Sequence, residues 1–552
     1  MSQEETLRII PLGGLGEIGL NMMLIEYGDS AIALDCGVMF PEAAMLGIDL
    51  VVPDVTYLRE RPGRLRGLVC THGHEDHIGA FPFVARELPV PTYATPFAQA
   101  LLENKLDEHE LDVPIERFRA GDSWRIGPFE IEAVHITHSI VDAVALAIRT
   151  PLGTIVHSGD FKFDQTPLDG VPSDISRLAA LGSEGVLLLL SDSTNVERPG
   201  ITPSERSLIK NFEAVFARAR GRVLVSTFAS HLHRIQQVID VSARAGRRVA
   251  VAGRGMVTNL AIGQELGYLR VPPGVLVELG EVRQVPPERL TVLTTGSQAE
   301  PLSALTRIAT NDHRQVVLEP GDTVIFSSRI IPGNERAIAD VTNHLYRRGA
   351  EVLHEHVASL HVSGHASQSE LALMLQLTRP RYFVPVHGEY RHLARHCALA
   401  AEAGVPSAHC FLLEDGDVLE IDGAGVRRGE PVIAGRVFVD GKGVGDVGDI
   451  VLRDRRHLSD GGIVLVILAL NQHSGDLVSG PDLISRGFLA EEESQVYLDR
   501  AREVVLEALA GLAPESRTVP AEVKEEVRKA LRRHFKRTLD RRPVILPVVV
   551  EF

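Results

Sequence analysis

The sequence predicts an α/β fold in which one α/β domain is inserted into another and a small α+β domain follows at the C-terminus. Three observations carry this prediction. Short β-rich runs that end in polar, metal-binding residues fill the first 200 residues, and a strand–helix rhythm replaces them between about 205 and 360. The first pattern then returns, because the β-rich run at 382–386 ends in His387.

The 552 residues are too many for one ordinary core, since domains hold roughly 100 to 200 residues. We expect the first domain at 1–204 and 361–435, the inserted domain at 205–360, a linker at 436–460 and a C-terminal domain at 461–552. The β-rich runs of the first and inserted domains lie at 7–10, 31–34, 67–70, 153–157, 222–225, 248–251, 290–293 and 323–326.

The C-terminal domain follows a glycine-rich stretch at 440–446, which is typical of a linker or turn. Beyond it we expect a strand at 463–468, amphipathic helices at 491–512 and 520–540, and a final strand at 544–549.

The composition excludes disordered and membrane-embedded classes. Hydrophobic residues make up 44% and charged residues 24%, and no apolar run reaches the ~20 residues that span a bilayer. The acidic N-terminus lacks the basic flank and apolar stretch of a secretory signal, so we expect a cytoplasmic protein. The cysteines lack paired short spacings, which indicates reduced, structural thiols at Cys36, Cys70, Cys397 and Cys410.

The net charge of −16 argues against broad nonspecific binding of nucleic acid, because phosphate contacts normally require Lys and Arg. The stretch 528–537 is strongly basic. We interpret it as a solvated or subunit-facing helix surface in preference to an RNA contact.

Residues 14–19, GLGEIG, match the dinucleotide-binding pattern GxGxxG. That pattern needs a helix to begin there, so that the helix N-terminus faces a pyrophosphate. Residues 20–27 have instead the pattern of a second strand that leads to a turn at Gly28 and Asp29. The sequence therefore favours a tight turn between two strands over a nucleotide site.

The segment from His72 to His77 concentrates acid/base and metal-binding side chains after the β-rich run 67–70. Two imidazoles two residues apart are followed at the same stride by a carboxylate and then by a third imidazole, so these groups can converge on two adjacent divalent ions from one short turn. Burying so many ionisable groups without a metal would be costly, which disfavours ordinary surface or core histidines. The ligands predicted from this segment are His72, His74, Asp76 and His77.

Two metals need further ligands, and the candidates lie near the ends of other β-rich runs. They are His138, Asp160 and His387. His135 competes with His138, and the sequence alone does not separate them. His157 lies within a strand pattern, which favours a core histidine or one that supports a ligand.

The motif His72-x-His74-x-Asp76-His77, together with Asp35, His138 and Asp160, resembles the motif set of the metallo-β-lactamase fold. Asp192 in SDSTN, His365 in SGHAS, and His387 resemble the three motifs of its nucleic-acid-processing β-CASP branch. Within that branch the chain resembles the bacterial ribonucleases J over nearly its whole length. No ligand position departs from the family pattern.

The resemblance implies an αββα sandwich with an inserted β-CASP domain over a metal cleft. It implies two divalent metal ions per subunit, either zinc or manganese or both, with magnesium as a further candidate. One ion would be bound by His72, His74, His138 and Asp160. The other would be bound by Asp76, His77, Asp160 and His387, while Asp35 would orient the histidines.

The chemistry that follows is hydrolysis of a phosphodiester by metal-activated water, with Asp76 in the catalytic set. Asp192 paired with His365 is the candidate general acid for the leaving 3′ oxygen, and the alternative for Asp192 is a turn or capping role. A pocket for a 5′-phosphate would use Ser363, Gly364, His365, Ser367, Ser230 and His231. For Ser230, a turn without any ligand is an equal alternative.

We therefore expect a ribonuclease that degrades single-stranded RNA from 5′-monophosphate ends, with endonuclease activity as a second mode, in RNA maturation and mRNA decay. The alternatives are a small-molecule metallo-hydrolase, a DNA-processing β-CASP nuclease and an inactive scaffold. The inserted domain disfavours the first, His387 disfavours the second through the family resemblance, and the intact ligand set disfavours the third. The amphipathic C-terminal helices and the family predict a homodimer or homotetramer.

Overall fold

The computed structural model describes residues 6–42, 44–300, 302–331, 333–354, 357–441, 443–489 and 491–552. The chain divides into two compact units. The larger unit holds Met1–Phe40 and Leu50–Val437, and the smaller holds Pro41–Asp49 and Phe438–Phe552. None of the helices in the described part of the chain combines the length and apolarity needed to cross a membrane.

Two mixed sheets form the centre of the larger unit. The first has the strand order β22-β21-β1-β3-β4-β6-β7-β8. Its strands are β1 (Leu7–Gly13), β3 (Met22–Tyr27), β4 (Ser30–Leu34), β6 (Leu65–Val69), β7 (Thr92–Ala94), β8 (Ile115–Arg117), β21 (Leu419–Asp422) and β22 (Gly425–Arg428). The second has the order β19-β13-β12-β11-β10-β9. Its strands are β9 (Ser123–Ile126), β10 (Phe129–His135), β11 (Val144–Thr150), β12 (Gly153–His157), β13 (Val186–Asp192) and β19 (Tyr382–Val386).

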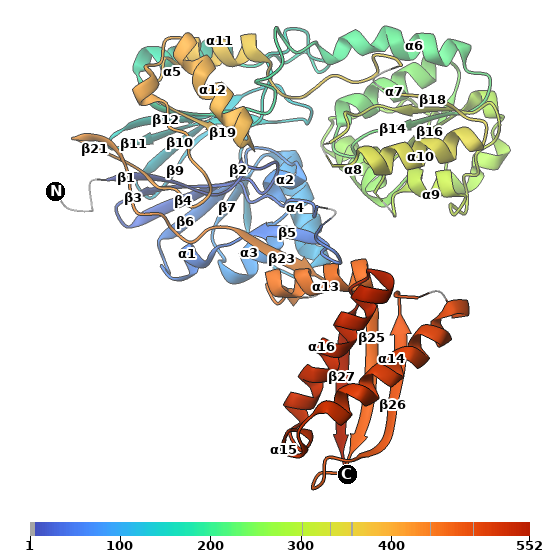
Figure 1. Cartoon of the computed structure of the whole chain (residues 1–552). Coiled ribbons are helices and arrows are strands. Elements are labelled where there is room, and N and C mark those ends of the chain that lie inside the picture. The colour runs from blue at the N-terminus through green and yellow to red at the C-terminus, as the bar shows by residue number, and fades with distance from the viewer. Residues whose placement is uncertain are drawn as a thin grey trace. The chain divides into compact units, whose positions relative to one another are not determined.

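The two sheets pack face to face through alternating apolar residues. Ile9, Ile25 and Val69 of the first sheet share a buried core with Leu146 and Val384 of the second. Helices cover the outer faces (Figure 1). They are α1 (Thr56–Arg59), α3 (Phe81–Glu87) and α4 (Pro96–Glu108) on the side of the first sheet, and α5 (Ile175–Glu184), α11 (Gln368–Thr378) and α12 (Tyr390–Glu402) on the side of the second. The predicted αββα sandwich is confirmed.

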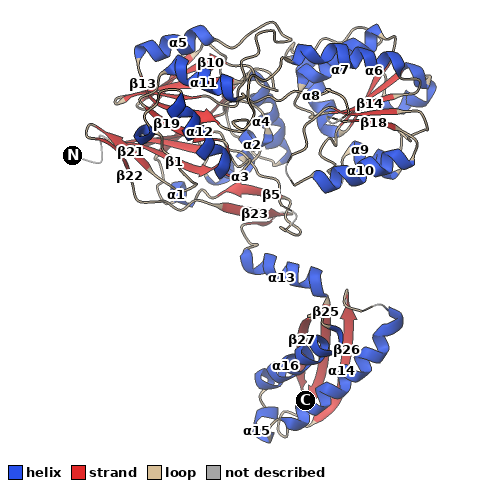
Figure 2. Cartoon of the chain, turned by 45° about the horizontal axis from the view of Figure 1, so that its top comes forward, coloured by secondary structure: helices blue, strands red, loops and turns tan. Residues whose placement is uncertain are grey.

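The inserted domain leaves the sandwich after β13 and returns before β19. These two strands pair in parallel, with Leu190 opposite Val384, although nearly two hundred residues separate them. Between them lies a parallel sheet in the order β15-β16-β14-β17-β18, with helices on both faces (Figure 2). Its elements are β14 (Val223–Ser226), β15 (Arg248–Ala252), β16 (Leu290–Thr294), β17 (Thr323–Phe326), β18 (Glu351–Leu353), α6 (Ile209–Arg218), α7 (Leu232–Arg244), α8 (Arg254–Glu265), α9 (Ala304–Thr310) and α10 (Glu335–Arg347).

The smaller unit contains a sheet in the order β26-β25-β27, one face of which packs against α14 and α16. Val464 and Val466 of β25 share this core with Val505 of α14 and with Val527 and Leu531 of α16. The elements are α13 (Asp449–Gly461), β25 (Ile463–Leu470), β26 (Leu477–Arg486), α14 (Glu491–Gly511), α15 (Pro514–Arg517), α16 (Pro520–Leu539) and β27 (Val544–Glu551).

Two parts of this unit differ from the sequence prediction. Residues 436–460, expected as a linker, contain β23 (Arg436–Asp440), β24 (Gly443–Val444) and most of α13. Strand β26 was not predicted, because Gly480 and Pro481 interrupt its pattern and both residues are rare inside strands.

The glycine-rich segment 14–19 forms a turn between strands, as predicted. The short β2 (Leu15–Gly16) follows β1, and β3 begins at Met22 without an intervening helix. Gly14 has a φ of +92°, and an added Cβ there would lie 2.4 Å from Oδ1 of Asn21, so no larger residue fits. The nucleotide-site interpretation is therefore excluded by the geometry of the turn.

Candidate metal centre

The predicted ligands gather at one edge of the sandwich because their strands run in the same direction. Asp35 follows β4 and His72 follows β6, and these two strands are parallel. Asp160 and His387 follow β12 and β19, which are both parallel to β13. Loops after parallel strands meet at the carboxyl edge of a sheet, so residues far apart in sequence converge there.

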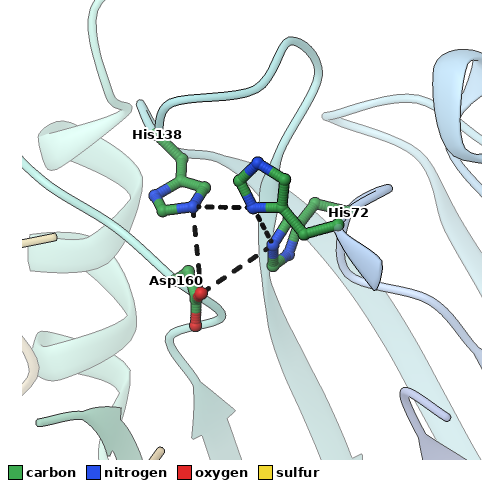
Figure 3. Close-up of side chains that lie close together, drawn as sticks. His72, His138 and Asp160 are labelled. Atoms are coloured by element: carbon green, nitrogen blue, oxygen red, sulfur yellow. Dashed lines mark hydrogen bonds and ion pairs between the residues drawn. The ribbon is translucent and has the colours of Figure 1, made fainter. Parts of the chain in front are cut away.

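The first group of donors consists of His72, His74, His138 and Asp160, whose ligand atoms all lie within 4.8 Å of one another. Nδ1 of His74 lies 3.1 Å from Nε2 of His72 and 3.2 Å from Nε2 of His138. Figure 3 shows the imidazoles of His72 and His138 pointing toward the carboxylate of Asp160, and their Nε2 atoms each lie 3.8 Å from its Oδ2.

The second group consists of Asp76, His77, Asp160 and His387. Oδ2 of Asp160 lies 3.1 Å from Nε2 of His387 and 3.2 Å from Nε2 of His77. Asp160 therefore belongs to both groups and lies between them. These are the two sets that the family resemblance implies.

The protonation states of the first group suit a cation. Burial lowers the pKa of His74 to about 4, and it also lowers the pKa values of His72 and His138 well below their usual range. Neutral imidazoles have lone pairs free for a metal ion. Three such nitrogens around one carboxylate form a donor set typical of zinc and related divalent ions.

In the second group the carboxylates dominate. Burial alone would lower the pKa of His387, but Asp160 and Asp76 raise it to about 10. In the described part of the chain, no lysine or arginine forms an ion pair with Asp76 or Asp160. The buried carboxylate of Asp160 and the half-buried one of Asp76, without a cationic side chain, fit a site in which metal ions offset the negative charge.

Asp35 supports the second group from behind. Its Oδ2 lies 2.8 Å from Nδ1 of His77, which leaves Nε2 of that ring directed at Asp160. The carboxylate also accepts hydrogen bonds from the backbone N–H and the hydroxyl of Thr71. This arrangement fixes the ring orientation of His77, as the resemblance implies for Asp35.

A third group joins Asp192 and His365 to Asp160. Nδ1 of His365 lies 2.8 Å from Oδ2 of Asp192, and the ring is 21% exposed whereas Asp192 is buried. Burial opposes the charge on His365, but Asp192 raises its pKa; in turn, His365 lowers the pKa of Asp192 against the effect of burial. The pair therefore favours the protonated imidazole and the ionised carboxylate, and the imidazole is the more accessible of the two groups.

Three further polar residues of the sequence lie outside the ligand groups. Glu75 pairs with Nζ of Lys105 at 2.7 Å. Nε2 of His135 lies 3.1 Å from the carbonyl oxygen of Val171, so the structure brings His138, and not its competitor His135, into the cluster. His157 is buried at the end of β12, where its Nδ1 accepts a hydrogen bond from the N–H of Gly159 and so supports the loop that carries Asp160.

The predicted 5′-phosphate loop lies against the metal centre. The carbonyl oxygen of Gly364 lies 2.8 Å from Nδ1 of His138, and an added Cβ at Gly364 would meet that ring at 2.7 Å. Oγ of Ser363 accepts from the N–H of His365 and from the side chain of Asn195. Ser367 caps the first turn of α11.

Ser230 and His231 lie just before α7, as predicted, but no hydrogen bond joins them to the metal centre in the described part of the chain. Nε2 of His231 lies 3.1 Å from a carboxylate oxygen of Glu205 instead. Their role as phosphate ligands remains a prediction.

Two residues that support the site were not predicted from the sequence. The side-chain amide of Asn21 donates to the carbonyl oxygen of Asp76 and lies 3.2 Å from Nε2 of His77. Nδ1 of His396 lies 3.0 Å from the hydroxyl of Ser193, next to Asp192. The position of Asn21, a polar residue two places after the glycine-rich segment 14–19, could have indicated it, whereas nothing local distinguishes His396 on its helix.

Family models match successive parts of the chain. The metallo-beta-lactamase superfamily matches 15–193, and the beta-CASP domain of ribonuclease J matches 220–345. The Zn-dependent metallo-hydrolase RNA specificity domain matches 349–412, and the ribonuclease J C-terminal domain matches 450–552.

Curated relatives align over almost the full length. Ribonuclease J of Thermus thermophilus is 42% identical, over 99% of this chain and 96% of its own. Ribonuclease J2 of Bacillus subtilis is 40% identical over 99% of both chains. The chain belongs to the ribonuclease J family. Ribonuclease J 1 of Streptococcus pyogenes is a further relative, 41% identical over 98% of this chain and 97% of its own.

The ribonuclease J fold extends to distant structures. A crystal structure of a protein of unknown function from Enterococcus faecalis matches 75% of this chain and 99% of its own, with a TM-score of 0.54 and 16% identity. This likeness concerns the fold alone. The family membership and the inserted β-CASP domain together disfavour the alternative that the protein is a small-molecule hydrolase.

Proposed function

We propose that this protein is a metal-dependent ribonuclease that hydrolyses single-stranded RNA from the 5′ end, prefers a 5′-monophosphate and also cuts internally. Its place would be RNA maturation, including that of rRNA, and mRNA decay in the cytoplasm. The observation that supports this most is the pair of donor groups that share Asp160, in a chain of the ribonuclease J family. The DNA-processing alternative has no comparable support.

Two divalent ions, zinc or manganese, would bind the two donor groups, with magnesium as a weaker candidate for so many imidazoles. When bound, they would lower the pKa of an attacking water and stabilise negative charge on the phosphoryl oxygens. Asp160 would hold the two groups at a fixed separation, and Asp35 would hold the ring of His77 in position.

His365 would supply the proton that the leaving 3′ oxygen needs, so that the products carry a 5′-phosphate and a 3′-hydroxyl. Support comes from its raised pKa, its contact with Asp192 and its partial exposure next to the first donor group. The loop of Ser363, Gly364 and Ser367, with Ser230 and His231 as further donors, is our proposal for the terminal phosphate.

The first test is digestion of one 5′-labelled RNA that carries either a monophosphate or a triphosphate, with manganese or with a chelator. We expect metal-dependent release of labelled mononucleotide, faster from the monophosphate and abolished in Asp76→Ala. His135→Gln is the matched control, because that histidine lies outside the donor groups. Internal cuts alone would contradict the proposed binding of a 5′-phosphate. If no metal supported any cleavage of RNA, the proposed ribonuclease activity itself would be wrong.

We also propose that two copies associate through the C-terminal sheet. Opposite the face that packs on α14 and α16, β27 exposes Leu546, Val548 and Val550 beside the outward residues of β25. An apolar patch of this kind is self-complementary about a twofold axis. Leu546→Glu with Val548→Glu should halve the mass measured by sedimentation, whereas Val257→Glu, another exposed apolar position, should not. An unchanged mass in the double variant would rule this surface out.

A further inference from the structure

The segment 528–542 is the densest cationic stretch of the sequence, with eight lysines and arginines and one acid, Asp540. It stands against a whole-chain charge of −16. The C-terminal half of α16 and the turn after it therefore form a local excess of positive charge that could meet a phosphate backbone.

The helix presents these cations on one face. Val527, Leu531 and Phe535 are buried against the sheet, so the side chains between them face outward. Exposed residues follow one another at intervals of four, as in Lys529, Arg533 and Arg537, or Arg532 and Lys536. Four helical residues rise about 6 Å, so each of the two rows repeats charge at about that interval.

Several of these cations lack an acidic partner. Arg528 and Arg533 pair with Glu525 and Glu526 nearer the start of the helix. Among the described residues, no carboxylate or carbonyl oxygen contacts the side chains of Arg532, Lys536, Arg537 or Arg542. Complementarity to the helix dipole accounts for cations in the last turn, at Lys536 and Arg537, but not for those one turn earlier.

In place of the solvated or subunit-facing surface that the sequence favoured, we infer from these unpaired cations a second RNA-binding surface, on the smaller unit. It contacts the backbone phosphates of single-stranded RNA through Arg532, Lys536 and Arg537. The inference rests on the proposed function, since it takes RNA as the substrate. An anionic membrane is the less favoured occupant, because α16 exposes no large apolar side chain to insert beside the cations. Contacts with backbone phosphates require a positive charge on a long side chain, and they carry no preference for the base sequence of the RNA.

The test measures binding of the full-length protein to an oligouridylate of about 20 nucleotides, in chelator, across a range of salt concentrations. For single strands, each phosphate contact contributes about 0.7 to the slope of log affinity against log salt. Replacing three contacting cations should make that slope shallower by about 2. The variant is Arg532→Gln, Lys536→Gln, Arg537→Gln.

A variant matched in charge and exposure separates a local surface from a general charge effect. It replaces exposed cations of the inserted domain, Arg314→Gln, Arg336→Gln and Arg347→Gln. If the cations of α16 bind RNA, this variant should keep more of the wild-type dependence of affinity on salt than the α16 variant does. Arg532→Lys with Arg537→Lys should retain the slope, because charge rather than guanidinium geometry makes the contact.

Equal slopes in wild type and the α16 variant would overturn the inference, as would an equal loss in both glutamine variants. Binding of wild type to vesicles of anionic lipid, lost in the α16 variant while RNA binding is unchanged, would reassign the surface to a membrane. Failure of the proposed function has a different signature, because wild type would then release no labelled mononucleotide in any metal.

Discussion

Two buried clusters of acids and histidines lie in the larger unit, and they offset their charge in opposite ways. The metal centre contains Asp76 and Asp160 with histidines as their ion-pair partners in the described structure. The second, which we name the Glu205 cluster, contains Lys162, Asp164, Glu205, His231 and Arg234. Nη2 of Arg234 lies 2.6 Å from Glu205, and both side chains are buried.

The difference shows that a buried acid beside a histidine does not by itself define a metal site. In the Glu205 cluster the chain supplies its own cation, and the pKa of His231 falls to about 4 because burial outweighs the nearby carboxylate. Arg234 also donates to the carbonyl oxygens of Ser327 and Leu360, so it ties α7 to the end of β17 and to the segment that leaves the inserted domain. In the metal centre the cation has to come from outside the chain.

The largest effect should come from Asp160→Asn, which removes the carboxylate common to both donor groups. We expect ribonuclease activity to fall by at least about three orders of magnitude, since metal activation of water is worth several kcal/mol. Elemental analysis should find both metal ions depleted. His135→Gln is the control, and retention of two ions per chain in Asp160→Asn would contradict the assignment of Asp160 as the shared ligand.

Substitutions in the Glu205 cluster should change the stability of the protein and leave its metal content unchanged. Arg234→Met leaves Glu205 buried without its guanidinium, which should lower the free energy of unfolding by about 3 to 5 kcal/mol. Denaturant unfolding followed by circular dichroism measures the loss. Adding Glu205→Leu to Arg234→Met should recover much of it, because the uncompensated charge is gone. Loss of metal from the folded single variant would show that the two clusters are not independent.

A smaller effect is expected from Asp35→Asn, which changes the support of His77 without removing a ligand. The amide has one acceptor oxygen in place of two, so it cannot serve both the ring of His77 and Thr71 as the carboxylate does. Metal affinity should fall about 10- to 100-fold, as measured by competition with a chromogenic chelator. Thr71→Val removes the hydroxyl that contacts both oxygens of Asp35 and Nδ1 of His72, but it leaves the carboxylate on the ring of His77 and should have a smaller effect. Equal affinity in Asp35→Asn and wild type would mean that His77 needs no such support.

Local patterns predicted which donor residues lie together, because the spacing of His72 to His77 places four of them on one turn and strand ends place the others at one edge. The choice between His135 and His138 needed the structure, since both follow the same strand and only the course of the loop separates them. The partner of His231 was equally hidden, because Glu205 lies 26 residues away and no local pattern pairs them. In the smaller unit, β26 was missed for the local reason that Gly480 and Pro481 interrupt its pattern. The membership of Pro41–Asp49 in that unit depends on contacts with residues about four hundred positions later, which no local pattern shows.

A third way to offset buried acids completes the comparison. Among the residues that the structure describes, Glu17 and Asp415 lie next to one guanidinium, that of Arg436, whose Nη2 is 2.7 Å from Glu17. One cation cannot offset two carboxylates. Burial, and then the charge of Glu17, raise the pKa of Asp415 from 3.8 to about 8. Here the missing positive charge is a proton, which the folded protein holds at neutral pH and the unfolded chain releases.

This assignment predicts how Asp415→Asn changes stability with pH. Because the folded pKa is raised, the stability that the protonated acid contributes is complete below about pH 4 and is lost as the pH rises through about 8. Asparagine stays neutral, and its oxygen can still accept from the N–H of Leu15. As the pH rises from about 4 to about 8, the stability of the variant should therefore increase relative to that of wild type, by about 1.4 kcal/mol for each unit of pKa shift. Thermal unfolding of both proteins in chelator near pH 5, 7 and 9 measures the difference in their stability. If that difference were constant with pH, Arg436 alone would offset both acids and Asp415 would hold no proton.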